Sequence, residues 1–342
     1  MTKKLIINRK YCINSTSKDT LSCYILSAIV FVIIVILVVN PGKYNYSIMQ
    51  GLNLFIVAVL PGLFPFMFLT KLLTGLGVVK KLSLKLSPVT KFLFNTSGIS
   101  GYVFIMSILS GYPIGAKLIS DLYCANVITQ SDAKKMCAFC TTSGPIFIIA
   151  SVGAVMFGSV KVGVVLYFAH IISSVMCGII LSGRRKKTPL NTTNSPTLHI
   201  PDNLLANTMK NTVESVFLVG AYITIFFLFA DILTDIGILS GITTLLNKLL
   251  SAVGINNVSN GIISGMLEVT RGCKLLSQNI NLYSVCFACF GISFSGLSII
   301  LQSMSFLNKC KIKARYFIFV KCVHAIISFF VCMLICKITN LF

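Results

Sequence analysis

The chain has 342 residues, of which 56% are hydrophobic and only 11% are charged, and its mean hydropathy is +0.90. A soluble domain carries roughly 25% charged residues, so the composition excludes a soluble globular domain and predicts an all-α polytopic membrane protein. The net charge of +21 would indicate nucleic-acid binding in a soluble protein. Here the basic residues lie between apolar runs, as in cytoplasmic loops, so we expect a lipid bilayer and no nucleic acid as the partner.

The N-terminal region, residues 1–40, is predicted to be a cytoplasmic tail followed by an uncleaved first transmembrane helix. The segment MTKKLIINRKYCINSTSKDT carries five basic residues, and the apolar run LSCYILSAIVFVIIVILVV follows it. This run is long for a signal peptide, and VVNPGKYN after it has no A-x-A-like cleavage site. We therefore expect residues 21–39 to cross the membrane.

Six further apolar runs are long enough to cross a bilayer, which requires about 20 residues. They cover residues 47–69, 137–157, 162–182, 208–231, 281–303 and 316–338. A polar linker at 183–203 begins with the basic cluster 184–187 and is expected on the cytoplasmic side. It separates 45–182 from 204–305, and 306–342 adds a basic loop and a last transmembrane helix.

The segments 45–182 and 204–305 are predicted to repeat each other. FMFLTKLLTGLG (66–77) aligns with FFLFADILTDIG (226–237), and Ser-Gly pairs at 110 and 143 correspond to pairs at 264 and 295. The basic loops place the two halves of the chain in opposite orientations. Each half has three crossings and one re-entrant hairpin, and the third crossing of the second half is the last helix, 316–338. The predicted fold is an inverted repeat of about seven crossings and two re-entrant or broken helical hairpins, as in many transporters.

The first hairpin contains SGYPIGAKLISDLY, residues 110–123. Gly111, Pro113 and Gly115 interrupt an otherwise apolar helix, and Tyr112 offers an aromatic face between them. Irregular backbone at membrane depth is tolerated where it is covered by protein or lines a watery cavity. Lys117 stands four residues before Asp121, which fits either a surface ion pair or a role in such a cavity.

The second hairpin, NGIISGMLEVTRGCKLLS (260–277), carries Glu268 in its middle. An acid within a membrane segment is a functional candidate by default, as a solute ligand or proton carrier. A buried carboxylate is costly unless it is paired, and Arg271, three residues on, is the nearest candidate partner.

Two more breaks are expected, at TTSGPIFI (141–148) and GISFSGLSI (291–299). Their hydroxyl groups and glycines suit a polar solute or a helix cap, and the alternative is a plain kink with back-bonded hydroxyls. The agreement of all four breaks favours a central site. From these two breaks the candidate binding residues are Thr142, Ser143, Gly144, Ser295 and Gly296.

Two pairs of cysteines have CxxC spacing, Cys137/Cys140 and Cys286/Cys289. Together they could form a four-thiolate metal site, but both lie in apolar stretches where cysteine acts as a small hydrophobic residue. We expect no metal or other cofactor. The sequence has no nucleophile–base constellation, P-loop or Rossmann fingerprint, so we expect no enzyme, and His170 and His324 are left without a role.

The motifs SGYPIGAKLISDLY, TTSGPIFIIASVGAVMFG and GMLEVTRGCKLLS resemble a family of sporulation integral membrane proteins of endospore-forming bacteria. That family is grouped with the nucleoside-recognition or Gate domain family, similar to parts of concentrative nucleoside transporters and ferrous-iron transporters. The resemblance covers roughly residues 45–305 and implies a protein of a mother-cell or forespore membrane, needed for spore cortex formation. The positions that match its motifs are Gly111, Tyr112, Pro113, Gly115, Lys117, Ser143, Gly144, Pro145, Glu268, Arg271 and Gly272.

The expected function is that of a transporter-like membrane protein that binds or translocates a small polar solute at the central site. A nucleoside-like compound is one candidate solute, and a second copy of the chain or other sporulation membrane proteins are candidate partners. The alternative is a non-transporting scaffold that recruits partners for cortex assembly. A dry contact between the hairpins, with Glu268 pointing to a loop, would favour the scaffold.

Overall fold

The computed structural model describes residues 17–182 and 203–341, and within these ranges the chain is helical, with no strand. The chain divides into two compact units between Ser47 and Ile48. The first unit contains α1 (Ser17–Val39) and the start of α2 (Pro41–Leu54). The N-terminal tail before residue 17 and most of the linker predicted at 183–203 lie outside the described residues.

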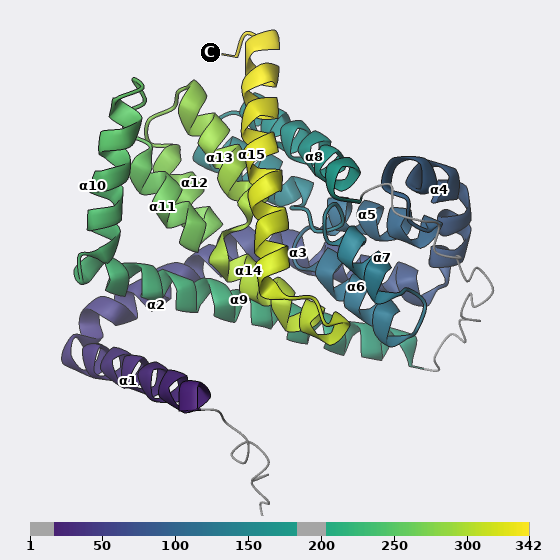
Figure 1. Cartoon of the computed structure of the whole chain (residues 1–342), viewed down its shortest axis with the longest axis horizontal. Helices are drawn as coiled ribbons and strands as arrows, with labels where there is room; N and C mark the ends of the chain where they lie inside the picture. Colours follow the sequence, from purple (N-terminus) through teal and green to yellow (C-terminus); the bar gives the residue numbers. More distant parts are fainter. Residues whose placement is uncertain (1–16, 183–202, 342) are drawn as a thin grey trace, which may run out of the picture. The chain divides into compact units, whose positions relative to one another are not determined.

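The second unit contains the remaining helices, and its two parts lie before and after residues 183–202 (Figure 1). Before them come η2 (Phe55–Val59), α3 (Leu60–Gly75), α4 (Val78–Phe94), α5 (Gly98–Ser110), α6 (Ile114–Cys124), α7 (Gln130–Met136), η3 (Ile146–Met156) and α8 (Val160–Ser182). After them come α9 (Leu204–Asp235), α10 (Ile238–Ser251), α11 (Ser259–Leu267), α12 (Val269–Leu276), α13 (Leu282–Phe294), α14 (Gly296–Leu307), η4 (Asn308–Cys310) and α15 (Ala314–Ile338).

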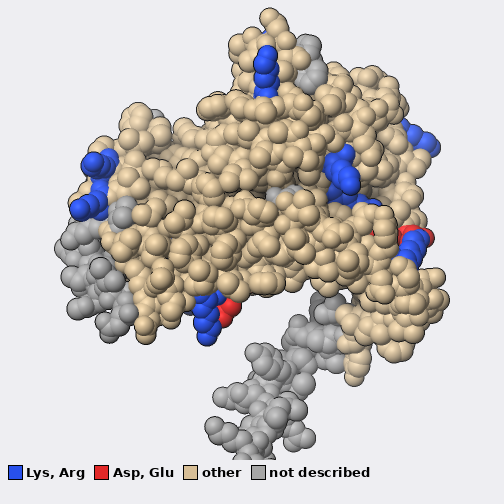
Figure 2. All heavy atoms as spheres, turned by 180° about the vertical axis from the view of Figure 1, so that it is seen from behind, with Lys and Arg blue, Asp and Glu red and all other residues tan. Residues whose placement is uncertain are grey.

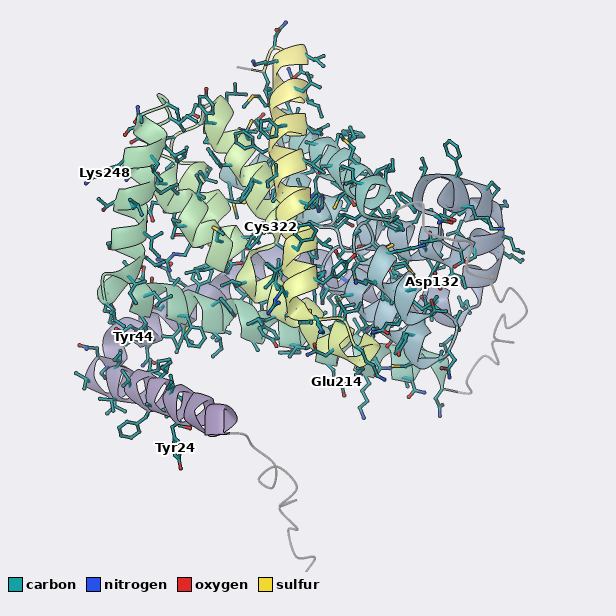
Figure 3. All side chains as sticks on the ribbon, viewed as in Figure 1. Tyr24, Tyr44, Asp132, Glu214, Lys248 and Cys322 are labelled. Carbon is teal, nitrogen blue, oxygen red and sulfur yellow. The ribbon has the colours of Figure 1, made fainter. Side chains whose placement is uncertain are left out.

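Several of these helices are long and apolar enough to cross a membrane. Four qualify among the described residues: 160–182, 204–235, 282–310 and 314–338. The number rises to six if two bent helix pairs, 27–57 and 81–110, are each counted as one span. Charged side chains are few and scattered on the face shown in Figure 2, and α10 at one edge of the second unit points Lys248 outward (Figure 3). The protein is therefore an integral membrane protein.

One expected crossing, residues 137–157, is not a continuous helix. Residues 137–144 form turns and irregular backbone, and η3 then has only 11 residues. The reason is local, because Gly144 is flexible and Pro145 disfavours a helical conformation at the residue before it. The hydroxyl of Thr141 donates to the Cys137 carbonyl at 3.0 Å, which satisfies one of the acceptors that the break leaves free.

The helices are interrupted at the other three expected stretches as well. Gly111 separates α5 from α6 with a left-handed φ of 77°. Glu268, with extended backbone, separates α11 from α12. Ser295, with a φ of 80°, separates α13 from α14. Each break therefore falls within a stretch whose sequence contains Gly, Pro or Ser.

The breaks lie against one another in pairs. A Cβ atom added to Gly111 would lie 2.6 Å from the Gly144 nitrogen, so the first and second breaks touch through their backbones. A Cβ atom on Gly296 would lie 3.0 Å from the Gly265 carbonyl oxygen and 3.2 Å from the Val269 nitrogen. Only glycine permits such close approach, and these contacts bring irregular backbone from distant parts of the chain together.

Small residues also allow the surrounding helices to pack. A Cβ atom on Gly153 would lie 2.3 Å from the Gly163 Cα, and one on Gly272 would lie 2.3 Å from the Gly265 Cα. Helices in lipid gain little from hydrophobic burial, and they associate through close packing of this kind and through interhelical hydrogen bonds. The same feature fixes α11 against α12 and η3 against α8, on either side of the breaks.

Candidate functional site

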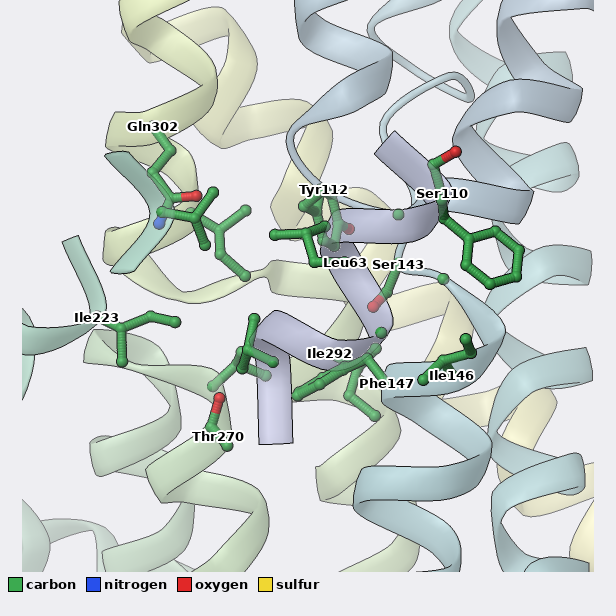
Figure 4. Close-up of a pocket in the computed structure, with 18 of the residues that line it drawn as sticks. Leu63, Ser110, Tyr112, Ser143, Ile146, Phe147, Ile223, Thr270, Ile292 and Gln302 are labelled. Atoms are coloured by element: carbon green, nitrogen blue, oxygen red, sulfur yellow. The ribbon is translucent and has the colours of Figure 1, made fainter. Parts of the chain in front are cut away.

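A cavity of about 80 Å³ lies where the breaks meet (Figure 4). It is large enough for several water molecules. Gly111 and Tyr112 line it from the first break, Ser143 and Gly144 from the second, and Glu268 from the third. Helix α14, which follows the fourth break, contributes Ile299 and Gln302. The remaining lining residues are Val59, Gly62, Leu63, Phe66, Leu109, Ser110, Ile146, Phe147, Val219, Ile223, Val269, Thr270 and Ile292.

Among the described residues, Glu268 is the only acidic one that lines this cavity, and its side chain is 1% exposed. It is the N-cap of α12. One carboxylate oxygen accepts a hydrogen bond from the backbone N–H of Arg271 at 2.7 Å, and the other accepts from the Thr270 hydroxyl at 3.0 Å. The positive end of the helix dipole adds to these bonds. The N-terminus of α12 therefore compensates for the burial of this carboxyl group.

Arg271 does not form the side-chain ion pair with Glu268 that we expected. Its guanidinium group pairs with Asp231 on α9 at 2.6 Å and lies over the Phe227 ring at 5.8 Å. The physical reason is that Glu268 already has two hydrogen-bond donors at the start of α12, whereas Asp231 faces Arg271 from a neighbouring helix. Arg271 is not among the cavity-lining residues and joins α12 to α9.

Lys321 on α15 donates hydrogen bonds to residues of two of the breaks. Its ammonium group donates to the Thr141 carbonyl at 2.6 Å and to the Tyr112 hydroxyl at 3.0 Å, and it is 1% exposed. It also lies 4.6 Å from the centre of the Tyr112 ring, a cation–π contact. Lys321 was not among the predicted site residues, although a lysine within an apolar helix indicates a functional or structural role.

His170 connects the second break to α13. Its Nε2 atom accepts a hydrogen bond from the Ser143 backbone N–H at 2.9 Å. The ring proton must then sit on Nδ1, which donates to the Ser293 hydroxyl at 2.8 Å. His324 lies beside it, with ring centres 4.8 Å apart and its Nε2 donating to the His170 carbonyl at 3.1 Å. The two unassigned histidines thus support Ser143, a cavity-lining residue.

Several expected site residues lie next to the cavity without lining it. The Thr142 hydroxyl is hydrogen-bonded to the Ser107 hydroxyl at 3.0 Å, and both side chains are buried.

The other such residues belong to the first and fourth breaks. Pro113 is the N-cap residue of α6, and Gly115 packs so tightly that an added Cβ would lie 1.7 Å from the Cys140 carbonyl oxygen. Ser295, within hydrogen-bonding reach of Tyr112, and Gly296 form the fourth break.

Lys117 forms the surface ion pair that was one of its two interpretations. Its ammonium group lies 3.5 Å from Asp121, and the side chains are 24% and 56% exposed. It also lies over the Phe306 ring at 5.3 Å. Such a pair contributes at most about 1 kcal/mol, and Lys117 does not line the cavity.

The two CxxC pairs lie in different parts of the core. Cys137 and Cys140 belong to one apolar cluster, and Cys286 and Cys289 belong to another. Across the described ranges, no group of three or more His, Cys, Asp or Glu side chains is placed to hold a metal ion.

These features define a class: an integral membrane protein whose broken helices surround a buried, mostly apolar cavity with a few polar groups. The chain is similar to the sporulation integral membrane protein YlbJ of Bacillus subtilis (strain 168), with 25% identity over 310 residues. That alignment covers 84% of this chain and 76% of YlbJ. No family model matches the chain, and no solved structure matches it.

Proposed function

We propose that this protein is a YlbJ-like, transporter-like membrane protein that acts in sporulation, in formation of the spore cortex. In this proposal it binds or translocates a small polar solute at the cavity and catalyses no reaction. The sporulation role rests on the similarity to YlbJ. The solute-binding role rests on one observation above all: the buried carboxyl group of Glu268 lines a cavity formed by three helix breaks and α14.

The cost of the breaks supports a binding role. Backbone groups without helical partners are expensive in lipid, and such backbone persists where it is covered or where it lines a cavity. In this protein the second break depends on buried donors and acceptors from two other helices, Lys321 of α15 and His170 of α8. A plain kink would not need these partners.

We also propose the inverted repeat of seven crossings and two re-entrant hairpins. The order of helices supports it, since α3, α4, α5, a break and α6 precede the linker, and α9, α10, α11, a break and α12 follow it. Gly77 after α3 and Gly237 after α9 have similar left-handed φ values of 77° and 85°. In this arrangement the repeat forms the cavity, and Glu268 supplies a carboxyl group for which the first half has no counterpart near Pro113.

A screen of small polar metabolites, nucleosides included, against the purified protein tests solute binding. We expect at least one compound to raise the unfolding temperature of the wild type and to have little effect on Glu268→Gln. Glu214→Gln is the matched control, because Glu214 is exposed on α9 (Figure 3) and lies outside the cavity. A screen in which every effective compound acts equally on all three proteins would contradict binding at Glu268 and favour the scaffold.

A further inference from the structure

The amide of Gln302 on α14 is only half satisfied. The side chain is 1% exposed and lines the cavity (Figure 4). Its Nε2 atom donates to the Ser298 hydroxyl at 3.5 Å, a long hydrogen bond. Its Oε1 atom is buried and has no hydrogen-bond partner among the described residues. Buried polar atoms are nearly always paired, so an unpaired acceptor facing a cavity indicates a missing donor.

Three other polar side chains of the lining have hydrogen-bond partners among the described residues, and the Ser143 hydroxyl, which also lines the cavity, can donate or accept. The Ser110 hydroxyl is hydrogen-bonded to Thr70 at 2.5 Å, and the Thr270 hydroxyl donates to Glu268. The Tyr112 hydroxyl accepts from Lys321. Glu268 adds two more acceptor oxygens to the same lining, and a carboxylate can accept more than one hydrogen bond at each oxygen. Gln302 and Glu268 therefore offer acceptor oxygens to a ligand, and the carboxylate of Glu268 would repel an anionic ligand.

The rest of the lining is apolar. Phe66 and Phe147 provide two aromatic side chains, and Leu63, Ile223 and Ile292 provide aliphatic ones. Sites of this composition bind the apolar body of a ligand and use a few polar atoms to orient it. A ligand without an apolar face would leave most of this lining in contact with water.

We infer that the cavity binds a non-anionic solute that donates an N–H or O–H group to Gln302 Oε1 and packs an apolar face against Phe66, Phe147 and their aliphatic neighbours. This inference rests on the proposed solute-binding function and narrows it to a chemical class. Gln302 would then be a specificity-determining residue, since a site built to accept a hydrogen bond rejects analogues that lack the donor.

Three ring compounds of similar size test the inference. Benzamide donates N–H groups, methyl benzoate has no donor, and benzoate is an anion without a donor. Thermal unfolding of the purified full chain can be followed with a thiol-reactive dye, because the protein has 13 cysteines and most of the described ones are buried. We expect benzamide at 5 mM to raise the unfolding temperature by about 2 °C, and the other two compounds to change it by less than half as much.

The variant Gln302→Leu removes the acceptor, and we expect it to abolish the benzamide shift. Gln302→Met, which is closer in shape, is the second variant in case Gln302→Leu does not fold. Gln130→Leu is the matched control, because Gln130 is exposed on α7 and lies outside the cavity. It should keep the full benzamide shift.

Equal shifts from benzamide and methyl benzoate would overturn the inference and leave the proposed function in place, because the cavity would then bind without selecting a donor. A larger shift from benzoate, or a benzamide shift that survives in both Gln302 variants, would overturn it in the same way. No shift with any of the three compounds would overturn it as well. In that case the metabolite screen of Glu268→Gln decides separately whether the proposed function stands.

Discussion

Glu268 and Lys321 are both ionisable side chains buried at membrane depth. Each is stabilised there by a hydrogen bond to a backbone group. Glu268 accepts from the N–H of Arg271 at the start of α12, and Lys321 donates to the carbonyl of Thr141 in the second break. Isolated buried charges are very costly. Each group therefore ties a side chain to an irregular stretch of backbone, and the breaks and the buried charges stabilise one another.

Lys321→Met tests this dependence. The substitution keeps an unbranched side chain but removes the donor from the Thr141 carbonyl and the Tyr112 hydroxyl. Loss of a donor to buried acceptors costs about 1–3 kcal/mol, so we expect a lower unfolding temperature. The control is Lys337→Met at the exposed end of the same helix, which should unfold like the wild type. A Lys321→Met protein as stable as the control would contradict the bridging role.

At the scale of the helical elements, the sequence predicts where the helices break better than what each break contacts. Gly111, Gly144 and Gly296 lie in motifs that are recognisable as breaks, because glycine and proline weaken a helix wherever they occur. The predicted crossing at 137–157 is divided at Gly144-Pro145, within the stretch 141–148 where a break is expected from the sequence. The Arg271–Asp231 pair and the unpaired oxygen of the Gln302 amide depend on how helices far apart in sequence pack together. A local sequence pattern does not predict such contacts.

Gly115 shows how the structure changes one prediction at this scale. If Gly115 only interrupted an apolar helix, Gly115→Leu would give a straighter helix in a protein that still inserts but no longer functions. The structure leaves no room for a side chain there, since a Cβ would lie 1.7 Å from the Cys140 carbonyl oxygen. Leucine at this position would therefore test packing and not the break.

We expect even Gly115→Ala to destabilise the protein by about 1–3 kcal/mol, because α6 and the second break must move apart. Gly241→Ala is the control, since an added Cβ at Gly241 in α10 meets no atom within 4 Å and alanine favours a helix by up to about 1 kcal/mol. Thermal unfolding of both variants checks the prediction. Equal stability of the two would show that α6 and the second break are less tightly packed than described.

At the scale of the whole molecule, the composition and apolar runs are enough to predict an all-helical membrane protein. The number of crossings is harder to predict, because length and apolarity do not distinguish a crossing from a bent pair such as 81–110, whose helices meet at 93°. The orientation of each half across the membrane is predicted from the basic loops. One of these loops, residues 183–202, lies outside the described ranges.

Cysteine-accessibility labelling tests the proposed orientation. Single cysteines introduced at 183–203 and at 309–315 should react only with reagents that reach the cytoplasm, and one at the C-terminal Phe342 should react from outside. The wild-type chain gives the background, to which exposed Cys124 contributes. An internal C-terminus would remove one crossing and with it the inverted repeat.

The most direct test of a functional role for the cavity is the yield of heat-resistant spores from a strain that carries Glu268→Gln. The wild-type chain must first restore sporulation in its host or in a Bacillus subtilis strain that lacks YlbJ. Glutamine retains an oxygen that can accept from the Arg271 N–H, so membrane levels and unfolding temperature should stay close to those of the wild type. We predict that Glu268→Gln lowers the yield at least about tenfold, while Glu214→Gln does not. Normal spore yield from Glu268→Gln, at wild-type membrane levels, would contradict a functional role for the cavity.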